Sequence, residues 1–197
     1  MKNEKNIKRG ISYLIDIMIV FLIIALFNYV IPKKENNLNI QSQINDLNES
    51  TMKENINFST YFNEYSHLIY ELDKSNIVEY IVILIIIHIY FVFSPYLTGG
   101  KTLGMSLFHL KIVEKSTDKL SLIKLWIRNF IWNGIFYYLL LFICLTVLKD
   151  KIYFISTIIL GIIQILLVII SIFMIIYRKD CRGLHDILSN TKIKEEV

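Results

Sequence analysis

Residues 11–31 read ISYLIDIMIVFLIIALFNYVI, and this stretch decides the fold. A helix needs about 20 apolar residues to cross a hydrocarbon core about 30 Å thick. The stretch has 21 residues and one formal charge, the carboxylate of Asp16, so it predicts a membrane-spanning helix. A carboxylate inside such a helix costs roughly 2.5–3.5 kcal/mol on insertion. Asp16 is therefore expected to have a partner or a function.

Three further stretches have the length and apolarity of membrane spans, at 77–97, 127–148 and 152–177. The chain as a whole is 54% hydrophobic with a mean hydropathy of +0.50, which is too apolar for a soluble domain of 197 residues. The stretch at 77–97 is rich in β-branched residues, but an isolated strand in lipid would leave its backbone unpaired, so a helix is predicted there as well.

Lysine and arginine are distributed unevenly between the two sides of these four spans. The segment before the first span, the connector at 98–126 with Arg128, and the tail at 178–197 hold 15 of them, whereas the loop at 32–76 and the short turn after the third span hold 6. Positive charge is retained on the cytoplasmic side. The pattern predicts a single membrane domain over 1–197 in a cell membrane, with both termini cytoplasmic.

The loop at 32–76 is predicted to face outward. Its second part has apolar residues at helical spacing and predicts a short helix over the outer face; these residues are Phe58, Phe62, Tyr65, Ile69 and Leu72. Its first part is rich in asparagine and poor in large apolar residues, and we expect it to be mobile.

The connector at 98–126 predicts two small elements. Leu103, Leu107 and Phe108 indicate a short amphipathic helix on the membrane surface. The following LKIVEKSTDKLSL has apolar flanks around a polar turn and predicts a small β-hairpin, with which a strand at 191–194 could pair. The predicted fold class is therefore an all-α integral membrane protein with four transmembrane helices, a cytoplasmic amphipathic helix and a small β-hairpin.

Five polar residues fall near the predicted cytoplasmic half of the spans and form the candidate site: Arg9, Asp16, His88, Arg128 and Asn133. Arg9 and Asp16 are seven residues apart and so share a helix face. In a functional interpretation, Asp16 binds a cation or carries a proton in a cavity open to the cytoplasm, and an arginine sets its charge. In a structural interpretation, Asp16 and an arginine form an ion pair between helices. His88 is expected to form a hydrogen bond in packing.

These features resemble those of the RDD family of bacterial membrane proteins, which is named for one arginine and two aspartates. Arg9 and Asp16 match the arginine and the aspartate of the first helix. The segment TGGKTLGMSLFHLKIV is similar to the family's glycine-containing segment, and RGLHDILSNTKI to its closing segment, so that Asp186 matches the second aspartate. The resemblance implies a bacterial membrane protein with a role in transport, and cation/proton exchange has been attributed to some similar proteins.

Other residues of the closing segment, Arg182 and His185, are expected to join Asp186 in docking the tail onto the connector or onto Arg9. The chain has no G-x-S-x-G or H-E-x-x-H motif and no metal-ligand spacing, so neither an enzyme nor a cofactor is predicted. Basic residues flank the apolar runs and form no stripe for nucleic acid. Two functions stay open: transport or exchange of a small cation or solute at Asp16, and a non-catalytic accessory or scaffold role. The expected partners are the lipid bilayer and a second copy or another membrane protein.

Overall fold

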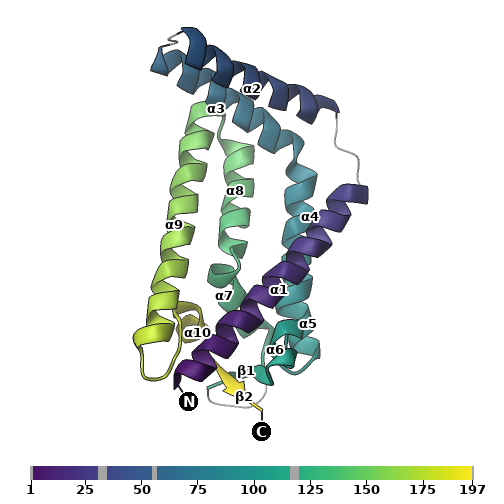
Figure 1. Ribbon diagram of the computed structural model, residues 1–197, viewed down its shortest axis with the longest axis vertical. Coiled ribbons are helices and arrows are strands. Elements are labelled where there is room, and N and C mark those ends of the chain that lie inside the picture. Colours follow the sequence, from purple (N-terminus) through teal and green to yellow (C-terminus); the bar gives the residue numbers. More distant parts are fainter. Residues whose placement is uncertain (1, 31–34, 55–56, 116–119, 197) are drawn as a thin grey trace.

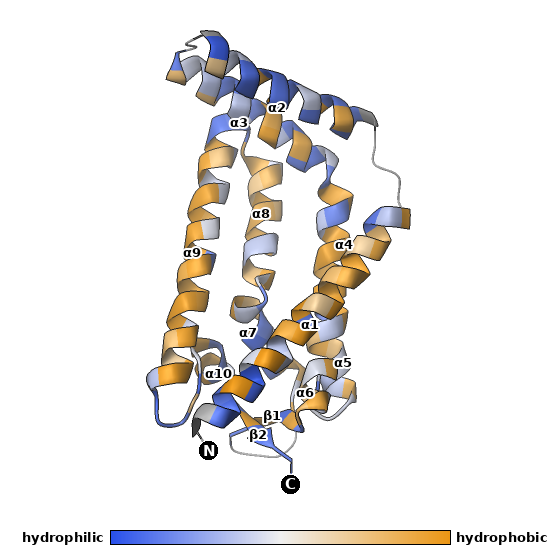
Figure 2. Ribbon diagram, in the orientation of Figure 1, coloured by the Kyte–Doolittle hydropathy of each residue, from blue (hydrophilic) through white to orange (hydrophobic). Residues whose placement is uncertain are grey.

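The structure is a computed structural model that describes residues 2–30, 35–54, 57–115 and 120–196. Within these ranges, three helical spans are long and apolar enough to cross a membrane. They are α1 (Lys2–Val30), α4 (Ile77–His88) with its continuation to Leu97, and α9 (Asp150–Tyr177). α4 and α9 run along the long axis of the molecule, and α1 crosses it obliquely (Figure 1). The surfaces of all three are predominantly apolar (Figure 2). The spans predicted at these three places are thus present as helices.

The stretch at 127–148 is not the straight helix predicted from its composition. It begins within α7 (Leu122–Trp132), which is followed by α8 (Ile135–Val147), and the two helices are bent by 72°. Gly134 lies at the bend with φ +71°, a left-handed conformation that glycine adopts at low cost. The 13 residues of α8 rise only about 20 Å, so α8 needs α7 to complete a crossing of a bilayer. The pair is a fourth span if it is counted as one broken helix.

The continuation of α4 is also irregular. A π-helical segment, η1 (Ile89–Phe93), joins α4 to α5 (Ser94–Leu97). Pro95 has no N–H with which to satisfy the carbonyl of Phe91. Asn129 of α7 donates its Nδ2 hydrogen bond to that carbonyl at 2.7 Å. The irregular part of the second span is therefore held by the broken third span.

Two helices cross the end of the bundle opposite the termini, α2 (Glu35–Glu54) and α3 (Phe58–Ser75) (Figure 1). The helix predicted from Phe58 onward is confirmed. The expectation of a mobile segment is wrong for Glu35–Glu54. Ile40 and Leu47 are seven residues apart, share one face of α2 and are buried, while α2 packs along α3. Asp73 of α3 accepts hydrogen bonds from the hydroxyls of Tyr80 at 2.5 Å and Tyr153 at 2.7 Å, which joins α3 to α4 and α9.

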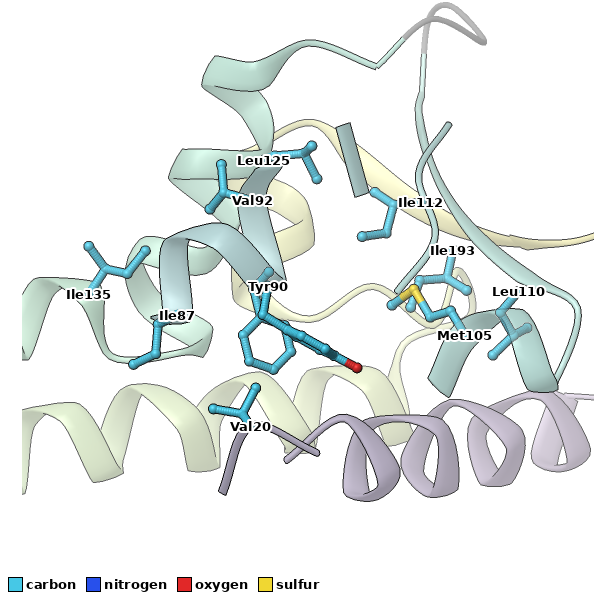
Figure 3. Close-up of a cluster of buried hydrophobic side chains, with 11 residues drawn as sticks. Val20, Ile87, Tyr90, Val92, Met105, Leu110, Ile112, Leu125, Ile135 and Ile193 are labelled. Carbon is cyan, nitrogen blue, oxygen red and sulfur yellow. The ribbon is translucent and has the colours of Figure 1, made fainter. Parts of the chain in front are cut away.

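The opposite end, which we call the terminal end, holds four short elements: α6 (Leu103–Leu107), β1 (Leu110–Glu114), α10 (Leu184–Leu188) and β2 (Thr191–Glu195). The strands pair antiparallel with Ile112 opposite Ile193. The strand predicted at 191–194 is present and pairs with β1, as expected. The turn of the predicted connector hairpin, at 116–119, lies outside the described residues, and Leu120 and Ser121 form no strand before α7 begins at Leu122. Both isoleucines are buried in a cluster to which α1, η1, α6, α7 and α8 also contribute (Figure 3).

Candidate functional site

Asp16 lies on α1 with 1% of its surface exposed and accepts three hydrogen bonds. The Tyr90 hydroxyl of η1 donates to Oδ1 at 2.7 Å, the Thr102 hydroxyl to Oδ2 at 2.6 Å, and the Gly104 N–H to Oδ1 at 2.8 Å. All three donors are neutral. In the part of the chain that the structure describes, no ion pair joins Asp16 to an arginine.

The connector approaches α1 closely at this point. Thr102 caps α6, since its Oγ1 accepts the N–H of Met105 at 3.2 Å while its hydroxyl hydrogen goes to Asp16. A Cβ on Gly104 would lie 2.2 Å from the carbonyl oxygen of Ser12 and 2.8 Å from Oδ1 of Asp16. Only glycine therefore lets the α6 backbone reach the carboxylate. Asp16 binds the connector to the first span.

Asp186 forms a second buried centre, at the start of α10. Its Oδ2 accepts from an Nη of Arg9 at 2.6 Å and from the N–H of Gly183 at 3.0 Å, and its Oδ1 pairs with Arg128. Burial alone would raise the pKa of this carboxyl, but the charges of Arg128 and Arg9 hold its pKa well below the usual range. Asp186 is thus a fully buried carboxylate that joins α1 and α7 to the tail.

His185 is fully buried beside this carboxylate. An Nη of Arg9 lies 2.8 Å from its Nε2, and Ser171 Oγ of α9 lies 2.5 Å from its Nδ1. Because arginine can only donate, we assign Nε2 as the acceptor and Nδ1 as the protonated nitrogen that donates to Ser171. Burial, and then the nearby arginine charges, lower the pKa of His185 well below its ordinary value, against the opposing effect of Asp186. The imidazole is neutral.

This neutral histidine predicts a loss of stability in mild acid. The unfolded chain binds a proton at His185 below its ordinary pKa of 6.5, and the folded chain does not, so stability is complete above that value and falls as the pH decreases. At a pH of about 5 the expected loss is about 2 kcal/mol. Thermal unfolding in detergent as a function of pH measures it. A His185→Asn variant whose curve keeps the wild-type slope between about pH 5 and 7 would contradict the assignment.

Arg182 holds the tail strand onto this centre. Its Nε donates to the carbonyl of Thr191 at 2.9 Å and an Nη donates to the carbonyl of Asp186 at 2.8 Å. Arg128 also donates to Thr191 Oγ1 at 3.2 Å. The three residues expected to dock the tail, Arg182, His185 and Asp186, are therefore all buried at the terminal end around Arg9 and Arg128.

The five residues of the candidate site are not brought together. Arg9 and Arg128 belong to the Asp186 centre, and Asp16 binds the connector. Nδ1 of His88 donates a hydrogen bond to the carbonyl oxygen of Leu84 at 2.7 Å, and its Nε2 accepts one from Nε1 of Trp126 at 3.1 Å. These two bonds occupy both ring nitrogens in local packing.

Asn133 lies at the bend between α7 and α8. Its Oδ1 accepts from the Tyr13 hydroxyl at 2.9 Å and its Nδ2 donates to Asn129 Oδ1 at 2.6 Å. Gln164 of α9 donates to the carbonyl of Ile131 at 2.6 Å, near the end of α7. Polar side chains from α1 and α9 thus surround the break in the third span. Non-helical backbone inside a membrane is tolerated where it is buried in protein or lines a cavity.

A groove runs past this break, between α1 and α9. The two helices diverge with increasing distance from the terminal end (Figure 1). It consists of two adjoining cavities of about 450 and 430 Å³ that share Tyr13, Ile17 and Trp132. We call it the α1–α9 groove. The cavity at the terminal end is lined by Asn6, Arg9, Gly10, Tyr13, Leu14, Ile17, Met105, Arg128, Trp132, Val168, Ile172, Ile175, Ile176 and Ile193. Among these described lining residues, the charged ones are Arg9 and Arg128, and Asp16 is not one of them.

Residues 6–190 match the model of the RDD family. The chain belongs to the RDD family. In this RDD protein, the arginine and the two aspartates matched to the family's name lie in two separate buried centres, Asp16 with the connector and Arg9 with Asp186. Searches of curated proteins and of solved structures found no match.

Sequence reasoning missed the groove and several residues that build the two centres. Trp132 is one of them: it lines both cavities of the groove, and its ring centroid lies 4.2 Å from that of His185. Thr102 and Gly104 lie within the glycine-containing segment, but nothing in their spacing identifies Asp16 as their partner. Gly134, followed by a further apolar run, was the available signal for the bend.

Proposed function

We propose that this RDD protein is a non-catalytic accessory protein of the cell membrane that binds another component of the bilayer in the α1–α9 groove. The terminal end is cytoplasmic in this proposal, in keeping with the distribution of lysine and arginine. The observation that carries it is the groove itself, whose apolar walls come from membrane-spanning helices and whose charged residues lie at one end. Binding sites of this kind are concave and mostly apolar, with a few convergent polar groups.

The arrangement of Asp16 supports this accessory role over cation exchange. A carboxylate that exchanges ions needs a path for them, whereas Asp16 is buried, accepts three hydrogen bonds and lines neither cavity of the groove. The charged residues that the groove does present, Arg9 and Arg128, would repel a cation. Neither circumstance favours Asp16 as an exchange site.

The polar groups of the Asp186 centre likewise support a role without catalysis. His185 and Asp186 are adjacent and could in principle act as acid and base. Both ring nitrogens of His185 have partners within the chain, and both oxygens of Asp186 are bound by arginine. These bonds hold the tail in place.

Filling the groove is the direct test of the proposal. Gly10 lines the groove, and a Cβ placed there meets nothing within 4 Å, so Gly10→Leu should enter empty space. Replacing a glycine inside α1 should raise the free energy of unfolding by about 0.5–1 kcal/mol through helix propensity. A component that binds the folded protein raises its unfolding temperature. We expect lipid extract to raise this temperature for the wild-type protein in detergent and to leave it unchanged for Gly10→Leu.

Ile7→Leu is the matched control, because Ile7 lies on the same helix, is 61% exposed and does not line the groove. It should respond to lipid extract as the wild type does. A Gly10→Leu protein that is folded and keeps the complete response to lipid would contradict binding in the groove.

A further inference from the structure

The terminal end of the α1–α9 groove carries an excess of positive charge. Arg9 and Arg128 both line it, and both are paired with the single carboxylate of Asp186. His185 adds no charge, since burial and the arginines lower its pKa. Arg128 makes its side-chain hydrogen bonds through one terminal nitrogen, and within the described residues its Nε and its other terminal nitrogen have no protein acceptor. These donors are available to an anion in the groove.

The rest of the groove is mostly apolar and exposed at the surface, and the side chains of Asn133 and Gln164 line it at the break in the third span. Leu14 and Ile17 of α1 are 60% and 43% exposed, and Ile172 and Ile176 of α9 are 42% and 52% exposed. These residues line the groove from two sides. The apolar lining continues beyond Trp132 along α1 to Ile24. A ligand that fills it must therefore have an anionic end beside the arginines and an apolar end along the helices.

An additional polar atom lies at the charged end. Asn6 Oδ1 is buried and has no hydrogen-bond partner within the described part of the chain, while Asn6 Nδ2 donates to the Ile175 carbonyl of α9 at 3.4 Å. A hydroxyl on the ligand's polar end would satisfy this acceptor. A buried acceptor without a donor is otherwise a cost to the fold.

Two other occupants fit these features less well. A transmembrane helix of a partner would place apolar side chains beside the arginines and cover their remaining donors without an acceptor. A small soluble anion would leave the apolar walls unused. Basic pockets between membrane helices on the cytoplasmic side bind the head groups of anionic lipids.

We infer that the groove holds one anionic phospholipid, with its phosphate at Arg9 and Arg128 and an acyl chain along Ile17, Trp132 and Ile172. This inference rests on the proposed function, because it names the bilayer component that the groove binds. It extends that proposal to a preference for one class of head group.

Trp132 provides the readout, because it lines both cavities of the groove and the sequence has only one other tryptophan. In a Trp126→Phe protein, Trp132 is the single tryptophan fluorophore, and bromine atoms on an acyl chain in the groove would quench it. The protein is reconstituted in unlabelled phosphatidylcholine with a small fraction of either brominated phosphatidylglycerol or brominated phosphatidylcholine. One net positive charge near the head group corresponds to about a fivefold preference, so brominated phosphatidylglycerol should half-quench Trp132 at about a fivefold lower fraction.

Gly10→Leu and Ile7→Leu, each combined with Trp126→Phe, give the matched comparison. The preference should disappear in Gly10→Leu, which keeps both arginines, and persist in Ile7→Leu. Soluble glycerol phosphate should not relieve the quenching, because it lacks the apolar part of the ligand.

The remaining outcomes separate the two proposals. If both brominated lipids quench equally and Gly10→Leu reduces both, the groove binds lipid without regard to charge, and the head-group inference is overturned while the proposed function stands. If neither lipid quenches Trp132 in the folded protein and Gly10→Leu changes nothing, the inference and the proposed function both fail. If glycerol phosphate relieves the quenching of Trp132, a soluble anion competes successfully for the groove, and the inference that the ligand is a phospholipid is overturned.

Discussion

Asp186→Asn is expected to lower the free energy of unfolding by about 3–5 kcal/mol, because it leaves two buried arginines without their carboxylate. Arg9 is 8% exposed and Arg128 is 4% exposed, so hydration compensates for only a small part of the lost pairing. Thermal unfolding in detergent near neutral pH measures the loss. The tail should also detach, because Asp186 joins α10 to α1 and α7. Faster labelling of the Cys181 thiol would report this detachment, since the Cys181 carbonyl accepts a hydrogen bond from Arg9 at 2.9 Å.

Asp180→Asn is the matched control for this change. Asp180 is also a tail aspartate paired with an arginine, Arg178, at 2.9 Å, but both side chains are more than 40% exposed. An exposed pair contributes about 0–1 kcal/mol, so this variant should unfold nearly as the wild type does. If Asp186→Asn and Asp180→Asn lower the free energy of unfolding by similar amounts, burial is not what makes the Asp186 centre important for stability.

Asp16→Ala is expected to lower the free energy of unfolding by about 3 kcal/mol. The change removes the acceptor of three hydrogen bonds and leaves the N–H of Gly104 buried without a partner. Ser12→Ala is the matched control one helical turn away on α1. Ser12 is equally buried, and its hydroxyl has no partner within the described residues, so its removal should change the free energy by less than about 1 kcal/mol. A large loss in Ser12→Ala and none in Asp16→Ala would contradict the structural role of Asp16.

Ion flux separates the two functions that the sequence left open. In vesicles containing the purified protein, we expect neither the wild type nor Asp16→Asn to couple proton movement to Na⁺ or K⁺. Cation-linked proton movement by the wild type, lost in a well-folded Asp16→Asn protein, would overturn the accessory role and restore Asp16 as an exchange site.

The spans could be predicted from the sequence because an unbroken apolar run of the right length leaves few alternatives in lipid. Hydropathy alone does not predict the bend at Gly134, since both sides of it are apolar, and the glycine itself was the only sign of it. The partner of β1 was equally ambiguous. Apolar and polar residues alternate in part along 110–114, so this strand could pair with a neighbouring or with a distant segment. In the structure it pairs with the tail strand, where Ile112 and Ile193 are opposite each other and both buried.

The candidate site was predicted only in part, for a similar reason. Spacing on one helix places Arg9 and Asp16 on a common face, and it was natural to expect them in one site. Their partners lie 74 to 177 residues away in the sequence. The spacing of polar residues on one helix does not indicate which distant residues will contact it. Burial of Asp16 followed from its place in an apolar run, whereas the division into two centres depends on how α6 packs against α1 and how α10 packs against α7 and α9.

The link between Arg9 and Asp186 also sets an order of events during synthesis. The two residues are 177 positions apart, so α1 leaves the ribosome long before its carboxylate exists. During that interval, Arg9 is an uncompensated positive charge beside the first span, which is the kind of charge that orients a helix during insertion. Neutralisation comes only when the closing segment is made. The same guanidinium is thus a lone charge while the first span is inserted and an ion-pair partner in the finished protein.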